Sequence, residues 1–157
     1  MTSDSEPNDA AAVPPRDVED FVRWDPETMA TGIESIDLQH QELIRRLNDF
    51  HRAHVLGSEA DEVKKMLKFL GQYAESHFQH EEALMDERRC PLRGETRSAH
   101  AHFLREYQEL ASLYSIDPDT DQMEAEIKSM VARWLVTHIC RVDVALRNCP
   151  PPEPKKK

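Results

Sequence analysis

Glycine and proline are almost absent from the middle of this 157-residue chain, and their scarcity constrains the fold more than any other feature. Between residues 33 and 148 they occur only at Gly57, Gly71, Pro91, Gly94 and Pro118. An all-β sandwich or barrel needs a turn roughly every 8–12 residues. The chain lacks turn-forming residues at that frequency, so a sandwich or barrel is excluded.

Four long stretches repeat apolar residues with the period of an α-helix, at about 35–56, 59–89, 94–114 and 119–148. Spacings of three, four or seven residues return side chains to one face of a helix. Gly71 lies inside the second stretch, where a helix tolerates it at a cost of about 1 kcal/mol. Because short connections make successive helices antiparallel, the sequence predicts an all-α, up-down-up-down four-helix bundle.

Both ends of the chain differ in composition from this central part. Residues 1–20 are acidic, rich in alanine and proline, and without helical period, and residues 150–157 read Pro-Pro-Pro-Glu-Pro-Lys-Lys-Lys. Such segments bury too little apolar surface to fold. We therefore expect two disordered tails flanking a bundle domain at 21–149.

The overall charge and the cysteines limit the function and the location. Twenty Lys and Arg against 30 Asp and Glu give a net charge of −10, which disfavours nucleic-acid partners. Apolar runs such as 134–136 are far shorter than the roughly 20 residues that cross a bilayer, and no secretory signal is recognisable. Cys90, Cys140 and Cys149 form an odd set without C-x-x-C spacing, which predicts reduced thiols and a cytoplasmic location.

Polar residues interrupt the apolar stripes at one depth of the predicted bundle. They are in phase with inward-facing residues and lie roughly 7–18 Å from the same end, as judged from the helical rise: His40, His77, Glu81, His100 and His138. Burying unpaired imidazoles and a carboxylate costs several kcal/mol unless a partner satisfies them. A hydrogen-bonded polar layer and a metal site both remain open as explanations.

The donor types favour the metal site. Imidazole and carboxylate suit iron, zinc, copper or manganese, and the absence of suitably placed thiolates argues against structural zinc or an iron–sulfur cluster. More donors share this layer than one tetrahedral ion needs, so the sequence predicts two metal ions bridged by carboxylates. His80 and His102 are expected to be exposed and Glu82 to face outward, while His51 and His54 are expected at the surface or as part of the core.

As a set, the motifs between residues 24 and 147 resemble the hemerythrin family, in its single-domain bacterial type. The resemblance rests on Trp24, Asp143 and the motifs at 31–33, 36–40, 77–82, 100–103 and 134–138. It implies two histidine pairs, one for each of two non-heme iron ions, and two bridging carboxylates: His40 and His77, His100 and His138, Glu81 and Asp143. Asp143 follows His138 by five residues, about 140° around an ideal helix, so helical phase alone would not select it.

The resemblance also implies a function. Hemerythrins reversibly bind O2 for carriage, storage or delivery, at the open position of the less crowded iron. The O2 pocket would be walled by Trp134 and Leu135, and an oxygen-consuming enzyme would be a natural protein partner for such a carrier.

One position departs from the family pattern. The family normally has a histidine four residues before the position of His100, where this chain has Thr96. A hydroxyl is a much weaker metal ligand than imidazole, so the second iron would be incompletely coordinated or weakly bound. This departure supports two alternative functions: a di-iron enzyme with oxidase or peroxidase-like activity, and a sensor of oxygen or iron.

Overall fold

In the computed structural model, the described residues are 18–57, 59–151 and 154–156. Among these residues every regular element is helical, and none is a β-strand. The elements are α1 Pro26–Met29, α2 Glu34–Val55, α3 Glu59–Glu87, α4 Arg93–Ile116, α5 Thr120–Trp134, the π-helix η1 Leu135–Ile139 and the 3₁₀-helix η2 Asp143–Asn148.

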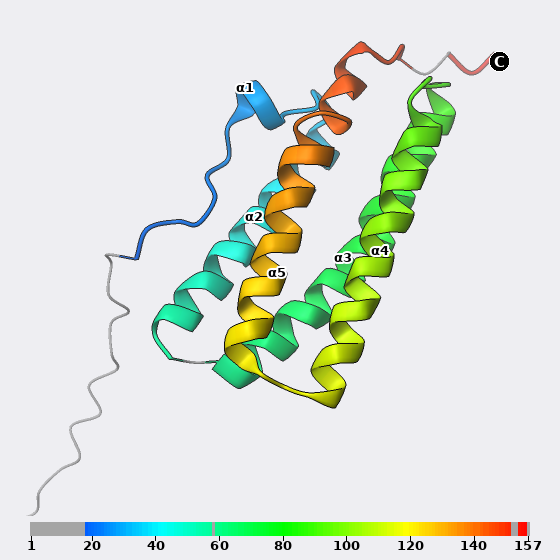
Figure 1. Cartoon of the computed structure of the whole chain (residues 1–157). Coiled ribbons are helices and arrows are strands. Elements are labelled where there is room, and N and C mark those ends of the chain that lie inside the picture. Colours follow the sequence, from blue (N-terminus) through cyan, green and yellow to red (C-terminus); the bar gives the residue numbers. More distant parts are fainter. Residues whose placement is uncertain (1–17, 58, 152–153, 157) are drawn as a thin grey trace, which may run out of the picture.

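The four long helices form the predicted up-down-up-down bundle. Each of α3 to α5 runs antiparallel to the helix before it, and α3 packs against α2, α4 and α5 (Figure 1). The short helix α1 lies at the end of the bundle where η2 closes the chain, and it contacts η2. The prediction of the fold class is therefore confirmed.

The described parts of the two termini bury little. Residues 18–20 precede α1 without regular structure, and 150, 151 and 154–156 are exposed. The rest of both predicted tails, at 1–17, 152, 153 and 157, lies outside the described residues. The limits of the bundle domain at 21 and 149 stay predictions.

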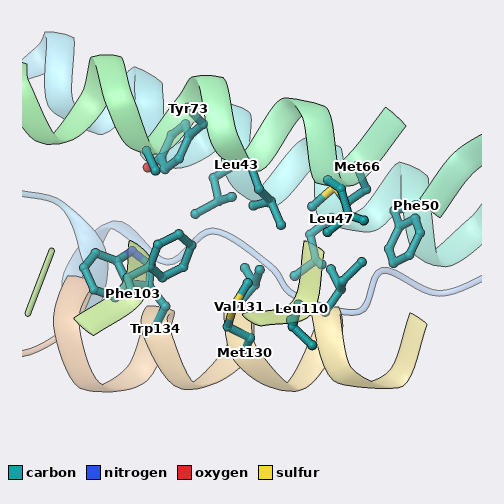
Figure 2. Close-up of a cluster of buried hydrophobic side chains, with 14 of the residues drawn as sticks. Leu43, Leu47, Phe50, Met66, Tyr73, Phe103, Leu110, Met130, Val131 and Trp134 are labelled. Atoms are coloured by element: carbon teal, nitrogen blue, oxygen red, sulfur yellow. The ribbon is translucent and has the colours of Figure 1, made fainter. Parts of the chain in front are cut away.

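The apolar stripes of the four long helices meet in one core (Figure 2). Leu43, Leu70 and Ile127, from α2, α3 and α5, are completely buried, and Phe103 of α4 packs beside Trp134. Full burial of such side chains contributes about 1.5–3 kcal/mol each. A second, smaller cluster lies towards the end of the bundle that holds α1: Met85, Cys90, Leu146 and Cys149, with Ile33 and Leu92 packed against it.

Gly71 inside α3 has a packing function. The hydroxyl of Tyr107 on α4 donates a hydrogen bond to the Leu67 carbonyl of α3, at 2.9 Å. A Cβ atom at position 71 would lie 2.6 Å from that hydroxyl oxygen. The glycine therefore lets the tyrosine lie across the helix backbone, which offsets its low helix propensity.

The fourth helix differs from its prediction. The sequence predicts one helix over 119–148, but α-helical geometry ends at Trp134. The backbone then widens into the π-helix η1, in which the Cys140 amide donates to the Leu135 carbonyl five residues earlier. After a turn, η2 continues from Asp143. π-Helical turns of this kind are common at functional sites, and this one changes the helical phase between His138 and Asp143.

The prediction of three reduced thiols is wrong for two of the cysteines. Cys90, just after α3, and Cys149, just after η2, form a disulfide with a Cα–Cα separation of 5.4 Å. Cys140 is the free cysteine of the described chain. Sequence spacing failed to reveal the pair because 59 residues separate its members. Since disulfides persist mainly in oxidising compartments, the cysteines no longer support a cytoplasmic location.

We predict that the disulfide makes a large contribution to stability. Replacing Cys149 by serine should lower the free energy of unfolding by about 2–4 kcal/mol, because the bond restricts the unfolded chain. Urea denaturation monitored by circular dichroism measures the change. Cys140→Ser is the matched control and should leave the midpoint unchanged. A wild-type midpoint that does not move on addition of a reducing agent would contradict the prediction.

Candidate metal centre

Six buried side chains from all four long segments of the bundle converge near the end that holds α1. They come from α2, α3, α4, η1 and η2: His40, His77, Glu81, His100, His138 and Asp143. Among the residues that the structure describes, their donor atoms form two overlapping groups, each with all atoms within 4.8 Å of one another. The structure thus brings together every residue for which the sequence predicted metal coordination.

The first group consists of His40, His77, Glu81 and Asp143. The Nε2 atoms of the two histidines lie 3.1 Å apart. Glu81 Oε1 is 3.2 Å from His40 Nε2 and 2.9 Å from His77 Nε2. Asp143 Oδ2 is 3.2 Å from His40 Nε2. The four residues therefore each offer one donor atom to the same position, where one metal ion could bind.

The second group consists of Glu81, His100 and His138. Glu81 Oε2 lies 2.9 Å from His100 Nε2. The second carboxylate also reaches this group, because Asp143 Oδ1 lies 2.9 Å from His138 Nε2. Each carboxylate therefore presents one oxygen to the first histidine pair and the other oxygen to the second pair.

If these residues formed a hydrogen-bonded polar layer without a metal, their buried polar atoms would all have hydrogen-bond partners. Among the described residues, both nitrogens of His138 and both carboxylate oxygens of Asp143 are buried without a hydrogen-bond partner. His138 Nε2 and Asp143 Oδ1 are close, yet their geometry does not make a hydrogen bond. A buried polar atom left unsatisfied costs about 1–3 kcal/mol. A cation would satisfy His138 Nε2 and the Asp143 oxygens, so the residues fit a metal site better than a self-contained polar layer.

The model of the hemerythrin HHE cation binding domain matches residues 31–146 of this chain. The chain belongs to the hemerythrin family. Non-heme iron is the cofactor of this family, and the two donor groups could hold it.

Individual relatives agree with this assignment. A bacteriohemerythrin from Pseudomonas aeruginosa (strain LESB58) is 29% identical over 113 residues, which cover 72% of this chain and 71% of the relative. A bacteriohemerythrin from Stenotrophomonas maltophilia (strain R551-3) is 32% identical over 108 residues, covering 69% and 68%. The fold is similar to that in a crystal structure of a hemerythrin mutant, with a TM-score of 0.74 at 21% identity over 83% of this chain and 98% of that chain.

The electrostatics of this hemerythrin site favour a charged glutamate. Burial alone would raise the pKa of Glu81, but hydrogen bonds from His100, His40 and His77 outweigh it and hold the pKa well below its usual value. Burial likewise disfavours protonated His40, yet the Asp143 carboxylate 3.2 Å away and the hydrogen bond with Glu81 raise its pKa to about 9. For His77 burial dominates and lowers the pKa. Without a metal, the site therefore binds a proton on His40 at neutral pH.

Two side chains outside the donor groups orient the histidines. His77 Nδ1 lies 2.7 Å from Gln39 Oε1, and His100 Nδ1 lies 2.8 Å from Glu82 Oε1. Acceptors on the far ring nitrogen fix the orientation of a histidine ligand and make it more basic. The sequence placed Glu82 facing outward. The structure corrects this, because Glu82 is only half-buried but turns its carboxylate to His100. The feature of the sequence that could have indicated this contact is that Glu82 directly follows the predicted ligand Glu81.

Aromatic rings cover three of the four histidines. Tyr73 stacks on His77 with centroids 4.7 Å apart, and Trp134 stacks on His138 at 3.9 Å. In both cases the ring comes from the residue four positions earlier. Phe78 stacks on His100 at 3.9 Å. Leu135 is buried beside this shell in the main core. Such packing excludes water and fixes the ring planes.

The remaining histidines lie outside the site, as expected. His102 is exposed as predicted, whereas His80, also predicted to be exposed, is half-buried because its Nε2 atom lies 2.9 Å from Ser35 Oγ of α2. His51 and His54 are half-buried on α2, and Lys128 of α5 donates to His51 Nδ1 at 3.0 Å. No member of this set belongs to a donor group within the described chain.

Metal affinity should depend on pH because of His40. The metal must displace the proton that His40 carries below its pKa of about 9. The apparent affinity for Zn²⁺ should therefore rise about tenfold per pH unit between pH 7 and 8.5, with release of a proton. Competition with a chromophoric chelator measures the affinity, and calorimetry in two buffers counts the protons. Equal affinity at both pH values would refute this dependence.

Glu82 should strengthen metal binding through His100. We expect Glu82→Ala to weaken the more weakly held Zn²⁺ about 10- to 100-fold, because His100 Nδ1 loses its acceptor. The measurement is the same chelator competition. Glu87→Ala, which removes an exposed acid at the end of the same helix, is the matched control. Identical behaviour of the two variants would show that the Glu82 contact has no effect on the metal.

Proposed function

We propose that this protein binds two non-heme iron ions and reversibly binds O2 for carriage, storage or delivery. The observation that carries the proposal is the arrangement of the two carboxylates. Glu81 and Asp143 each present one oxygen to one histidine pair and the other oxygen to the second pair. Bridging carboxylates offset the repulsion between two neighbouring cations.

In this proposal His40 and His77 would hold the first iron, and His100 and His138 would hold the second. When bound, iron would supply the electrons and the coordination position that O2 needs. The protein supplies neutral imidazoles and buried carboxylates. Gln39 and Glu82 keep two of the imidazoles oriented through their Nδ1 atoms.

We further propose that Trp134 and Leu135 wall the O2 pocket. Both side chains are buried, and Trp134 covers one face of His138. Apolar walls admit the apolar O2 molecule and exclude water and protons, which favours release of O2 over its reduction. An oxygen-consuming enzyme as partner and a cytoplasmic location remain predictions of the sequence.

Thr96 supports a second candidate function. Its side chain is completely buried, and its hydroxyl has no hydrogen-bond partner in the described part of the chain. If a histidine ligand is missing here, the second iron is more open than in an oxygen carrier. The alternative is therefore a di-iron oxidase or peroxidase-like enzyme.

Spectroscopy of the iron-loaded protein distinguishes these functions. Protein loaded anaerobically with Fe²⁺ should contain two iron ions per chain and develop a charge-transfer absorption band on exposure to O2. For a carrier the band should disappear under argon and return with O2. Rapid, irreversible oxidation of the iron with consumption of added hydrogen peroxide would favour the enzyme.

Matched variants connect the band to the proposed residues. His77→Ala should abolish the O2-dependent band and lower the iron content, whereas His102→Ala should behave as wild type because this side chain is exposed.

Bound iron should also increase the free energy of unfolding, by at least about 2.7 kcal/mol when free iron is in hundredfold excess over its dissociation constant. An unchanged melting temperature after chelation would contradict a buried iron site.

A further inference from the structure

The second donor group lies one helical turn from a hydroxyl without a hydrogen-bond partner among the described residues, that of Thr96. Asp143 reaches this group only through His138, whose Nε2 atom lies 2.9 Å from Asp143 Oδ1, whereas the four donor atoms of the first group all lie within 4.8 Å of one another. Thr96 lies one turn before His100 on the same face of α4, and both side chains are buried. If the protein binds two cations as proposed above, the second group has a buried hydroxyl where a further ligand would complete it.

The Thr96 hydroxyl is available as a hydrogen-bond donor. Its oxygen is fully buried, and no acceptor for it exists among the described residues. A Ser or Thr inside a helix usually bonds to the carbonyl one turn earlier or faces solvent, but this hydroxyl does neither. A bound group that accepts a hydrogen bond would remove the cost of this unsatisfied donor.

Charge determines which kind of group fits. Two divalent cations bring four positive charges, and Glu81 and Asp143 neutralise two of them. The loaded site would therefore keep a net positive charge in a buried environment, where an anion is strongly favoured. A small anion can coordinate the second cation and accept the hydrogen bond of Thr96 at once.

A groove between α3 and α4 leads from solvent to one side of His100. This groove of about 590 Å³ is lined by Phe78, Arg97 and His100, among others. The charged side chains of the groove are Arg97, Glu75 and Glu82, and Arg97 pairs with Glu82 and Asp86, so the attraction for an anion comes from the cations and not from the groove. Of the second donor group, His100 belongs to the lining of this groove.

We propose that the second cation position is completed by a small external anion, and that Thr96 is the protein group that donates a hydrogen bond to it. This anion site rests on the proposed two-cation function. The anion class is that of azide, cyanate or formate: a few atoms, one negative charge and a nitrogen or oxygen donor. Thr96 is a binding residue for this anion and not a metal ligand. The position is consequently open to anions from solution.

Anaerobic protein loaded with Co²⁺ tests this proposal without any oxygen chemistry. Azide is the probe, and calorimetry with the visible absorption of Co²⁺ gives the number and affinity of bound azide ions. Thr96→His should bind one azide fewer than wild type, because an imidazole fills the place. It should also hold the second Co²⁺ more tightly against a chelator.

Two further variants distinguish the effect of the Thr96 hydroxyl from the effect of the volume of its side chain. Thr96→Val has a similar shape without the donor and should bind this azide about 10- to 100-fold more weakly, as expected for a hydrogen bond to a charged group. Thr96→Ser restores the donor and should bind azide within a few-fold of wild type. Equal azide affinity in wild type and Thr96→Val would overturn the role of Thr96.

The cobalt content distinguishes failure of this inference from failure of the proposed function. Two Co²⁺ per chain with the same number of azide ions in wild type and Thr96→His would overturn the anion site alone. Fewer than two Co²⁺ per chain in both proteins would overturn the two-cation site and the anion site together. Reversible O2 binding, measured separately on the iron-loaded protein, is independent of both results.

Discussion

The structure depends on two carboxylates buried between two pairs of imidazoles. An isolated carboxylate in a protein interior is strongly disfavoured, and removing one partner of a buried charged pair costs about 3–5 kcal/mol. Glu81 keeps its charge through contacts with three histidines, whereas the oxygens of Asp143 lack hydrogen-bond partners in the described chain. The bundle, the π-turn and the aromatic rings all serve to hold these two groups at one depth.

Much of this arrangement is predictable from the sequence. The scarcity of glycine and proline inside long periodic stretches predicts four helices, and short loops make them antiparallel. His40, His77, Glu81, His100 and His138 follow from helical phase, because a polar residue on an apolar stripe must point inward. Their common depth follows from the rise per residue, and the donor atoms do converge.

Other features depend on backbone geometry or on distant contacts. The position of Asp143 could be obtained only from the family pattern, because the π-helix at 135–139 changes the phase that an ideal helix would have. The pairing of Cys90 with Cys149 depends on how the chain ends pack and leaves no local signal. The contact of Glu82 with His100 is likewise set by the packing of α3 on α4.

The disulfide also places some of the metal-binding residues inside a covalently closed loop of the chain and leaves the others outside it. Cys90 and Cys149 close a covalent ring that contains Thr96, His100, His138 and Asp143, while His40, His77 and Glu81 lie outside it. When the bundle opens, the ring keeps its donors at a high mutual concentration, as a tether does for linked binding modules. The first histidine pair has no such tether, so its assembly relies entirely on the docking of α2 against α3.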